Sequence, residues 1–422
     1  MIRRRTLLAG IAASALMTLP ALAETVELTV WDNAGNPGRE AAFAAFEAAN
    51  PDIKLNVVTF ASEEYKTQLR VTVAGGNTPD LFTTNGGFTF FEYVDRGAAM
   101  DITDLVEEYG WAERTEAEFL AADTDENGRI WGMPWNTTQY WQGLFYDKDF
   151  FEANDIPLPS SVEGFKDIAQ KIQDAGRYPI AFGDKDGWPA ILMLGDYLVQ
   201  TTTPDEIRKL NTGENTWTDF KPAKDAFEAM AKLAADGAFA PGFLSMNHEA
   251  AIMSWVGKRT AMLYNGTWWP NVAKTDDPGF AIGVAKLPMI DPDLPLQGTQ
   301  YWASIQLLMG AHLEGEKKEA AIKLFDFLTS KEGMILYGNA RKAITTNPQA
   351  NPEITEIAAF FREPEFLRQN DKPKIQFLDH AFPIPVIEVI KVELQKIMQN
   401  NGYTVDEALA AIEAAHVAER KS

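Results

Sequence analysis

The fold class is indicated by one stretch of the chain, which reads GKRTAMLYNGTWWP at residues 257–270. Residues 260–264 are compact and mostly apolar, which predicts a buried strand. Asn265-Gly266 is a turn-forming pair, so Trp268 is expected to follow the carboxyl end of that strand. In open α/β sheets this end faces the ligand crevice. The alternative is that Trp268 and Trp269 both lie in the core.

Tryptophans recur at comparable places in the chain. A tryptophan offers a flat apolar surface with one N–H donor, which fits a pyranose ring with its apolar C–H face and its rim of hydroxyl groups. Core packing is the alternative for each of them taken singly. Together with polar neighbours they predict a crevice suited to a neutral sugar or polyol. The tryptophans are Trp31, Trp135, Trp141, Trp188, Trp268 and Trp302, and the neighbours are Asp32, Asn33, Asn136, Gln142, Asp186, Asn265 and Gln300.

The first third of the chain alternates predicted strands and helices. Strands are expected at 26–31, at 53–60, and from 79 to the Asn85-Gly86-Gly87 loop, with a helix after Asn36-Pro37 and another capped by Ser62. This alternation predicts a parallel, doubly wound sheet. The loops at Asp32-Asn33 and Asn85-Gly86-Gly87 should therefore share one rim of the sheet. Further along, Asn127-Gly128 predicts a hairpin turn, and residues 130–134 should pair with residues 144–146. Two more strands are expected at 178–182 and 280–287. Helices are expected at 162–175, 190–199, 223–236 and 315–329.

Composition limits the class of protein. The chain has 422 residues with 46% hydrophobic content, which is enough for two or three domains with a large core. The formal charge is −22 and no basic patch stands out, so we expect no binding to nucleic acid. There is no cysteine, which excludes disulfides, thiolate metal sites and a lipid-modified cysteine.

Residues 1–23 have the features of a cleaved signal peptide. Arg3, Arg4 and Arg5 precede an apolar run at 7–19, and Ala21-Leu22-Ala23 is a small-residue cleavage site. The apolar run is too short to span a bilayer. Cleavage would leave 35 basic and 60 acidic residues, a formal charge of −25. General secretion is favoured, with twin-arginine export as the alternative, and the expected location is the bacterial periplasm.

The sequence contains no recognisable catalytic or metal-binding motif. No G-x-S-x-G element is present, and Lys258 lacks the glycine that a P-loop needs, since position 252 is isoleucine. The four histidines are far apart and have no metal spacing. The run from Asp123 to Gly128 copies the first half of a calcium loop, but the glutamate required at its twelfth place is Pro134. We therefore expect no cofactor, no metal and no enzymatic activity.

Several ordered segments resemble one known family. They include LTVW at 28–31, FEAANPDI at 46–53, VAGGNTPDLF at 73–82, WGMP at 131–134, FYDKDFF at 145–151, and the Gly257-Lys258 to Trp268 region. Each segment is short, but their order and spacing are specific. The mature chain resembles the extracellular solute-binding proteins of ABC sugar importers, the group that includes maltose-binding protein.

The resemblance implies two α/β lobes, each with a mostly parallel sheet flanked by helices and joined by a hinge of several crossings. Residues 24–133 and 289–345 would form the N-terminal lobe, and residues 134–288 and 346–422 the C-terminal lobe. It also implies that a monomer binds a carbohydrate between the lobes, closes over it and delivers it to the membrane permease.

The resemblance also implies a set of ligand contacts. Trp268 matches the tryptophan of a Gly-x-Trp motif, Trp302 matches a second family tryptophan, and Trp188 follows a strand where the family often places an aromatic residue. Arg341 could bind an anionic sugar, but a surface salt bridge is favoured for it. The full predicted set is Trp268, Trp302, Trp188, Asp32, Asn33, Asn85, Gly86, Trp135, Asn136, Asp186, Asn265, Gly266 and Arg341.

Three alternatives remain at this stage. The same scaffold could bind a polyol or a modified or anionic sugar, although the abundance of carboxylates disfavours anions. A periplasmic carbohydrate-active enzyme would need a cleft-facing carboxylate pair with one raised pKa. A structural or adhesion module is the third. The sequence does not identify the sugar, its anomer or its chain length.

Overall fold

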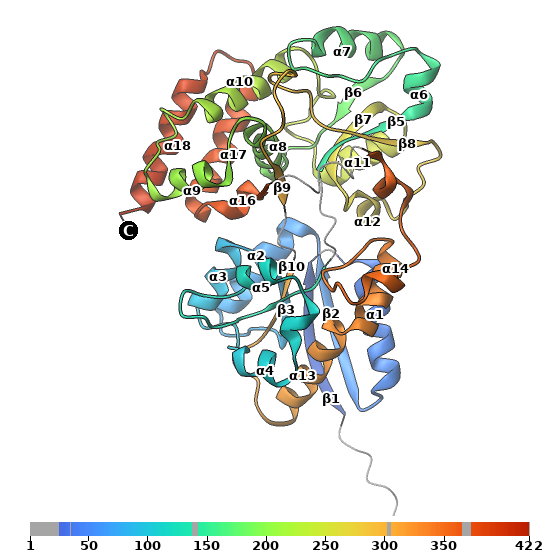
Figure 1. Cartoon of the computed structure of the whole chain (residues 1–422), viewed down its shortest axis with the longest axis vertical. Coiled ribbons are helices and arrows are strands. Elements are labelled where there is room, and N and C mark those ends of the chain that lie inside the picture. Colours follow the sequence, from blue (N-terminus) through green and yellow to red (C-terminus); the bar gives the residue numbers. More distant parts are fainter. Residues whose placement is uncertain (1–24, 34, 137–141, 302–304, 365–372, 422) are drawn as a thin grey trace, which may run out of the picture.

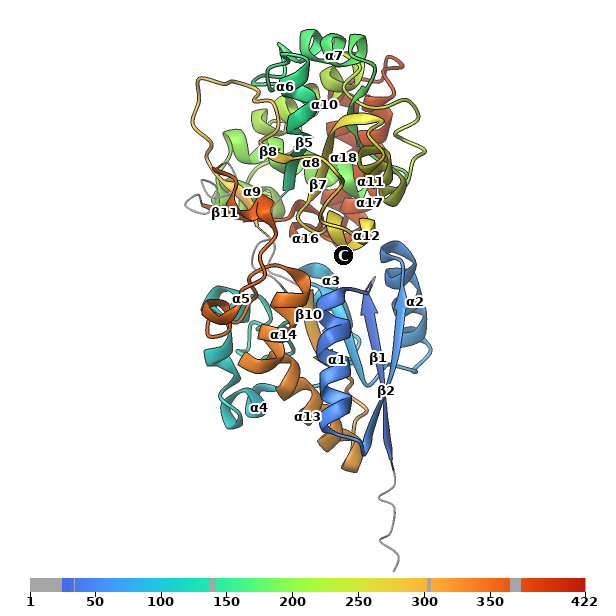
Figure 2. The same cartoon turned by 90° about the vertical axis from the view of Figure 1, so that its right-hand side faces the viewer.

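The computed structural model describes residues 25–33, 35–136, 142–301, 305–364 and 373–421. These residues form two lobes that lie one above the other (Figure 1), and Figure 2 shows the same separation from the side. Each lobe contains its own sheet with helices packed around it. The two-lobed α/β class predicted from the sequence is confirmed.

The N-terminal lobe is built on a five-stranded sheet with the order β2-β1-β3-β10-β4. β1 pairs in parallel with β2 and β3, whereas β10 is antiparallel to β3 and β4. The strands are β1 (Val26–Asn33), β2 (Ile53–Phe60), β3 (Leu81–Asn85), β4 (Met133–Pro134) and β10 (Ile305–Met309); the helices are α1 (Pro37–Ala49), α2 (Ser62–Ala74), α3 (Phe88–Asp95), α4 (Thr103–Glu108), η1 (Trp111–Arg114), α5 (Ala117–Ala122), α13 (Gly315–Thr329), α14 (Lys331–Arg341) and η2 (Asn351–Glu353).

Two hydrophobic cores lie on opposite faces of this sheet. Leu81 and Phe82 are consecutive in β3 and fully buried, yet they belong to different cores, as the alternation of side chains in a strand requires. Helices α1 and α13 contribute Phe46 and Phe325 to one core, and α2 contributes Tyr65 to the other. The helices on both faces therefore fix the sheet, whose carboxyl edge carries the loops after β1, β2 and β3.

The C-terminal lobe has a four-stranded sheet with the order β6-β7-β5-β8 and a separate parallel pair, β9 and β11. β6 and β7 are parallel, but β5 is antiparallel to both β7 and β8. The strands are β5 (Gln142–Asp147), β6 (Tyr178–Ala181), β7 (Thr260–Gly266), β8 (Ile282–Ala285), β9 (Thr299–Tyr301) and β11 (Lys374–Gln376); the helices are α6 (Lys148–Ala153), α7 (Phe165–Asp174), α8 (Trp188–Thr201), α9 (Pro204–Thr212), α10 (Lys221–Ala235), α11 (His248–Val256), α12 (Trp269–Ala273), η3 (Ala359–Arg362), α16 (Leu378–Ala381), α17 (Ile384–Met398) and α18 (Val405–Glu419).

Most predicted helix boundaries follow from local chemistry. The Asn36 side chain accepts a hydrogen bond from the backbone N–H of Arg39 at 3.0 Å and caps α1. The hairpin prediction at Asn127-Gly128 is confirmed, because Gly128 has a φ of +79° and Thr124 bridges Ile130. The cap predicted at Ser62 is wrong, since α2 begins at Ser62 and Ala61 stands at the N-cap.

Strand pairing differs from the sequence-based expectation. Residues 130–134 do not pair with 144–146; β4 pairs with β10, while β5 pairs with β7 and β8. The two segments are close in sequence but lie in different lobes. Both sheets are also mixed where mostly parallel sheets were expected, because β10 and β5 enter each sheet from a crossing between the lobes and not from a strand–helix–strand unit.

Three lobe boundaries also shift. Trp135 is fully buried in the N-terminal core, so that lobe extends past residue 133. Met289 donates its backbone N–H to the carbonyl of Ser160, and residues 289–301 pack on the C-terminal lobe. Ala350 returns to the N-terminal core. The chain thus passes between the lobes after β4, between β9 and β10, and again after α14.

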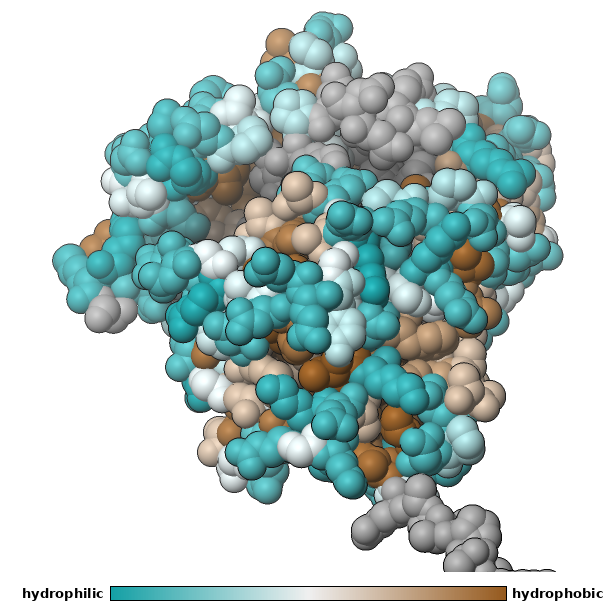
Figure 3. All heavy atoms as spheres, turned by 60° about the horizontal axis from the view of Figure 1, so that its bottom comes forward, coloured by the Kyte–Doolittle hydropathy of each residue, from teal (hydrophilic) through white to brown (hydrophobic). Residues whose placement is uncertain are grey.

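The surface of the N-terminal lobe that points away from the second lobe is mainly hydrophilic, with hydrophobic residues scattered among charged ones (Figure 3). Isolated exposed apolar residues of this kind are usual on globular proteins. Within the residues that the structure describes, no helix is both long and apolar enough to cross a bilayer.

Candidate functional site

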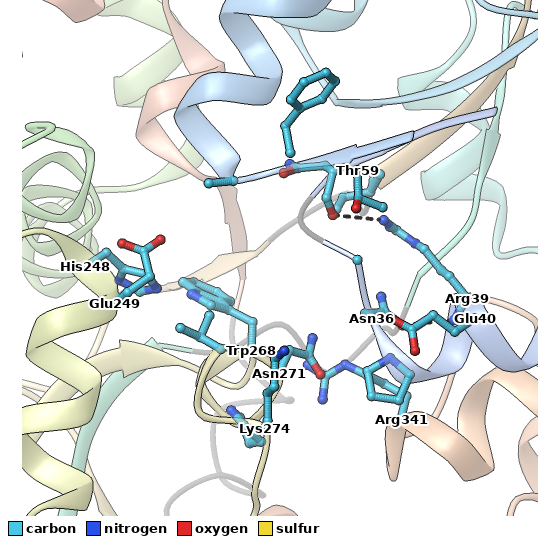
Figure 4. A pocket seen from close by; sticks show the side chains of 18 of the residues that line it. Asn36, Arg39, Glu40, Thr59, His248, Glu249, Trp268, Asn271, Lys274 and Arg341 are labelled. Atoms are coloured by element: carbon cyan, nitrogen blue, oxygen red, sulfur yellow. Dashed lines mark hydrogen bonds between the residues drawn. The ribbon is translucent and has the colours of Figure 1, made fainter. Parts of the chain in front are cut away.

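A pocket of about 1050 Å³ lies between the two lobes. Its walls come from the carboxyl ends of β1, β2 and β3 on one side and from the loops around α8, α11 and β7 on the other (Figure 4). This is the edge at which α/β sheets bind ligands. The residues that line it include Asn33, Asn36, Arg39, Glu40, Glu64, Lys66, Asn85, Trp188, Leu192, His248, Glu249, Trp268, Lys274, Asp276, Arg341, Lys342 and Asp379.

The N-terminal wall presents amide groups at two strand ends. Asn33 ends β1 and Asn85 ends β3, and both line the pocket. The Oδ1 atom of Asn33 is buried without a hydrogen-bond partner among the described residues. The Asn85 side chain likewise makes no hydrogen bond with any described residue. Both amides are therefore available to a polar ligand, as expected from the sequence.

Asp32 does not line the pocket. It is 1% exposed and forms an ion pair with Arg39, which is equally buried and does line the pocket. Burial raises the pKa of the Asp32 carboxyl, and the neighbouring Arg39 guanidinium opposes that shift. The guanidinium also lies 5.0 Å from the ring of Trp135. The direct ligand contact predicted for Asp32 is therefore wrong. Asp32 instead pairs with Arg39, and Arg39 lines the pocket.

The C-terminal wall carries two tryptophans. Trp268 stands at the N-cap of α12, directly after β7, and Trp188 is the first residue of α8. Both are partly exposed and line the pocket, with ring centroids 6.4 Å apart. The next residue, Trp269, is fully buried against Phe145 and Trp255. The two adjacent tryptophans therefore divide between pocket and core.

Gly266 sets the position of the Trp268 ring. A Cβ atom at Gly266 would lie 1.9 Å from Cζ3 of Trp268, so the indole folds back over the bare backbone of the strand end. The backbone here lies outside the left-handed region, so the absence of a side chain, not an unusual φ, is what this position requires. Gly266 thus acts through Trp268 and is not itself among the residues that line the pocket.

We expect Gly266→Ala to move the Trp268 indole and weaken solute binding by about fivefold. A displaced ring loses part of an aromatic contact, which is worth roughly 1 kcal/mol or more. Titration of intrinsic fluorescence would measure this. Gly86→Ala is a matched control, because its Cβ would approach the flexible Gln306 side chain no closer than 3.3 Å. Equal affinity in G266A and the wild type would contradict the role assigned to Gly266.

His248 completes this wall. It is the first residue of α11, is 8% exposed, and its ring centroid lies 4.7 Å from that of Trp188. Its Nδ1 atom lies 3.4 Å from Nδ2 of Asn265. Burial lowers the pKa of His248 to about 4, so the imidazole is neutral at pH 7 and can exchange hydrogen bonds with a neutral ligand. Asn265 is buried behind His248 and acts through it.

A partly buried carboxyl lies behind the same wall. Oδ1 of Asp196 accepts hydrogen bonds from Nε2 of Gln300 at 2.7 Å and of Gln142 at 3.2 Å, and Oδ2 accepts one from the Tyr264 hydroxyl at 2.8 Å. Both glutamine Nε2 atoms also bond the carbonyl of Leu192, a pocket residue. Burial raises the pKa of Asp196 to about 7, although these hydrogen bonds oppose the shift. The cluster fixes α8 to β5, β7 and β9.

Asp196→Asn is expected to change how stability depends on pH. Between about pH 4 and 7 the folded protein keeps a proton on Asp196 that the unfolded chain releases, so this carboxyl lowers stability as pH rises through that window. The asparagine variant lacks this loss. Its unfolding free energy relative to the wild type should increase by a few kcal/mol, on the order of 1.4 per pH unit, from pH 4 to 7. Urea denaturation at several pH values would measure the change.

Two comparisons make that test specific. Asp52→Asn removes a carboxylate from an exposed turn and is the control for the substitution itself. Asp184, a buried carboxyl whose pKa burial raises to about 7, should give a profile like that of D196N when replaced by asparagine. If the unfolding free energies of D196N and the wild type change with pH in parallel, Asp196 is ionised in the folded protein and the prediction is wrong.

Arg341 reaches the pocket from the end of α14. It is 5% exposed, and its Nη2 donates to the carbonyl of Thr267 at 3.1 Å in the opposite lobe. The prediction of a surface salt bridge is wrong, because the side chain is buried and no carboxylate pairs with it among the described residues. The adjacent Lys342 does form an ion pair across the lobes, with Asp276 at 2.8 Å.

The remaining predicted site residues lie elsewhere. Trp135 is fully buried and packs on Phe43, which makes the predicted ligand contact wrong. Asn136 is also fully buried and accepts a hydrogen bond from the Tyr337 hydroxyl at 2.8 Å. Asp186 and Gly86 do not belong to the pocket lining. Trp302 falls outside the described residues, so its predicted role is not addressed.

Sequence reasoning missed Arg39 and His248. Arg39 lies in the first turn of α1 and reaches the pocket only because Asp32, seven residues earlier, holds it there. His248 comes next to Asn265 only through the packing of α11 against β7. No sequence motif marks either residue. For Arg39, the available signal is a charged side chain in the first turn of the helix that follows Asp32-Asn33.

Comparison with known proteins places the chain in a family. The sequence profile described as bacterial extracellular solute-binding protein matches residues 33–335. The chain belongs to this family. Among curated solute-binding relatives, an uncharacterised ABC transporter extracellular-binding protein of Pyrococcus horikoshii is 26% identical over 248 residues, covering 58% of this chain and 56% of that protein. The multiple sugar-binding protein of Streptococcus mutans is 21% identical, with 58% and 57% covered.

In sequence, therefore, the chain spans little more than half the length of these two curated relatives. The structural match is longer. A solved chitin oligosaccharide binding protein superimposes with a TM-score of 0.80 at 21% identity, covering 93% of this chain and 99% of the other. At that identity the likeness concerns the fold.

Proposed function

We propose that this solute-binding protein captures a carbohydrate between its lobes and delivers it to the permease of an ABC importer. The observation that carries the proposal is the interlobe pocket, in which Trp188 and Trp268 oppose the free amides of Asn33 and Asn85. Apolar surfaces with a few placed polar groups suit a sugar ring. Relatives named for multiple sugars and for chitin oligosaccharide support this solute class.

The cycle depends on contacts with both lobes. A sugar stacked on Trp268 and hydrogen-bonded to Asn33 binds the two walls together, so it favours the conformation in which the walls are closer. A dissociation constant near 1 μM corresponds to about 8 kcal/mol. Aromatic contacts and hydrogen bonds of the kind present here supply a good part of that.

The cellular setting follows from the leader. We propose that residues 1–23 direct export and are removed, and that the monomeric mature protein works in the periplasm without a cofactor or catalytic step. General secretion is favoured over twin-arginine export. The lobe arrangement of the family supports docking of the closed form on membrane permease subunits. Sequencing the N-terminus of the exported protein would test the predicted cleavage after Ala23.

The deciding experiment is a ligand screen with the mature protein. Intrinsic fluorescence and melting temperature are recorded against mono-, di- and trisaccharides, sugar alcohols and acidic sugars. A saturable signal with a raised melting temperature is expected for one class, because a ligand that binds only the folded state stabilises it. Small-angle scattering should then show a more compact particle. A folded protein that responds to none of these solutes, or that hydrolyses an oligosaccharide, would contradict the proposal.

A further inference from the structure

The pocket contains one buried cation that forms no ion pair among the described residues. Five cationic side chains line it, and three of them pair with acids: Arg39 with Asp32, Lys66 with Glu63, and Lys342 with Asp276. The fourth, Lys274, is exposed to water. The fifth, Arg341, is 95% buried and pairs with no carboxylate among the described residues.

Arg341 also has unused hydrogen-bonding capacity. A guanidinium carries five N–H donors and cannot lose its proton in a protein. One donor bonds the carbonyl of Thr267 at 3.1 Å, and the buried Nε atom has no acceptor within the described part of the chain. An unpaired buried charge and an unmet buried donor both cost free energy. The described residues therefore leave this group able to bind a further acceptor.

The position of Arg341 defines where that acceptor must be. The carbonyl that holds the guanidinium belongs to Thr267, and Trp268 is the next residue. In Figure 4 the Arg341 side chain extends from the end of α14 toward the segment that carries Trp268 and Asn271. A sugar ring lying on the indole thus presents a substituent on its rim to the guanidinium.

We propose that the natural solute is an acidic sugar whose anionic oxygens bind Arg341 while its ring contacts Trp268. This inference rests on the proposed carbohydrate-binding function and narrows it. Planar carboxylate groups match the guanidinium fork with two parallel hydrogen bonds, and sulfo or phosphoryl groups offer the same oxygen spacing. The shared chemistry is a sugar with one anionic oxyacid group near the stacked ring.

Glu40 is the competing partner within the protein. It lines the same pocket from α1 and faces the Arg341 side of it in Figure 4, but it forms no ion pair with Arg341. If closure brought Glu40 to Arg341, the charge would be balanced without an anionic ligand. The two cases predict opposite preferences between a neutral sugar and its acid, so ligand binding distinguishes them.

The test compares matched sugars by isothermal titration calorimetry of the mature protein. The pairs are glucose and glucuronate, galactose and galacturonate, and their disaccharide counterparts, with hexose 6-phosphates as a third arm. The variants are Arg341→Gln and the control Arg96→Gln, an exposed arginine outside the pocket, and melting temperature confirms that each is folded. Arg341→Lys keeps the charge without the fork if the glutamine variant is unstable.

The expected result is that an acidic sugar binds roughly 10- to 100-fold more tightly than its neutral partner, that R341Q loses this preference, and that R96Q retains it. If the phosphorylated sugars bind more tightly than the uronates, the proposal stands and the anionic group of the solute is tetrahedral. Tighter binding of neutral sugars by the wild type overturns the inference but leaves the carbohydrate function standing. A folded protein that binds neither kind overturns both.

Discussion

Trp268→Ala is expected to weaken binding of the solute by about 2–3 kcal/mol, roughly 30- to 150-fold in the dissociation constant. The indole follows the carboxyl end of β7, and it lines the pocket while remaining partly exposed. A sugar that stacks on it loses most of its apolar contact when the ring is removed. Calorimetric titration with the ligand found in the screen measures this loss.

The neighbouring tryptophan provides the control for that variant. Trp269 is fully buried among aromatic side chains, so Trp269→Ala should lower the free energy of unfolding by about 3–5 kcal/mol. Trp268→Ala should lower it by only about 1 kcal/mol, because its ring is not part of the core. Trp268→Phe should keep part of the affinity, since a smaller flat ring remains. Unchanged affinity in W268A would remove the indole from the binding site.

Short-range sequence patterns predicted much of the fold. The strand–helix alternation of the first third, the cap at Asn36 and the turn at Gly128 all depend on neighbours in the chain, and the structure has them. The direction and pairing of β5 and β10 could not be obtained in this way. Both strands follow a crossing between the lobes, and their partners are decided by the packing of segments far apart in sequence.

The same distinction applies to the pocket. Trp268, Trp188, Asn33 and Asn85 lie next to strand ends or turns, and the rule that loops after strands gather at one edge brought them together correctly. Trp135 has similar neighbours in sequence, but Pro134 before it is already part of the sheet, and the ring turns into the core against Phe43. Whether a tryptophan at the edge of the sheet faces the pocket or the core depends on the side chains that pack around it. These contacts join segments far apart in the chain, so local sequence patterns do not predict them.

Asp32→Ala is expected to lower the free energy of unfolding by about 3–5 kcal/mol, the cost of removing one partner of a buried ion pair. Asp32 and Arg39 are each 1% exposed, and the variant would leave the Arg39 guanidinium buried without its carboxylate. Urea denaturation at pH 7 measures the loss. Asp205→Ala is a suitable comparison, because Asp205 pairs with Arg208 on the surface, where both are more than half exposed, and it should cost far less stability.

A second substitution separates the charge from the shape of the site. If the unpaired guanidinium causes the loss, Asp32→Ala combined with Arg39→Met should recover a large part of it, since the double variant buries no charge and keeps an apolar stem beside Trp135. A double variant as unstable as the sum of the single ones would mean that the two residues act independently. Recovery of stability with loss of solute affinity would show that Asp32 serves the pocket by holding Arg39 in its wall.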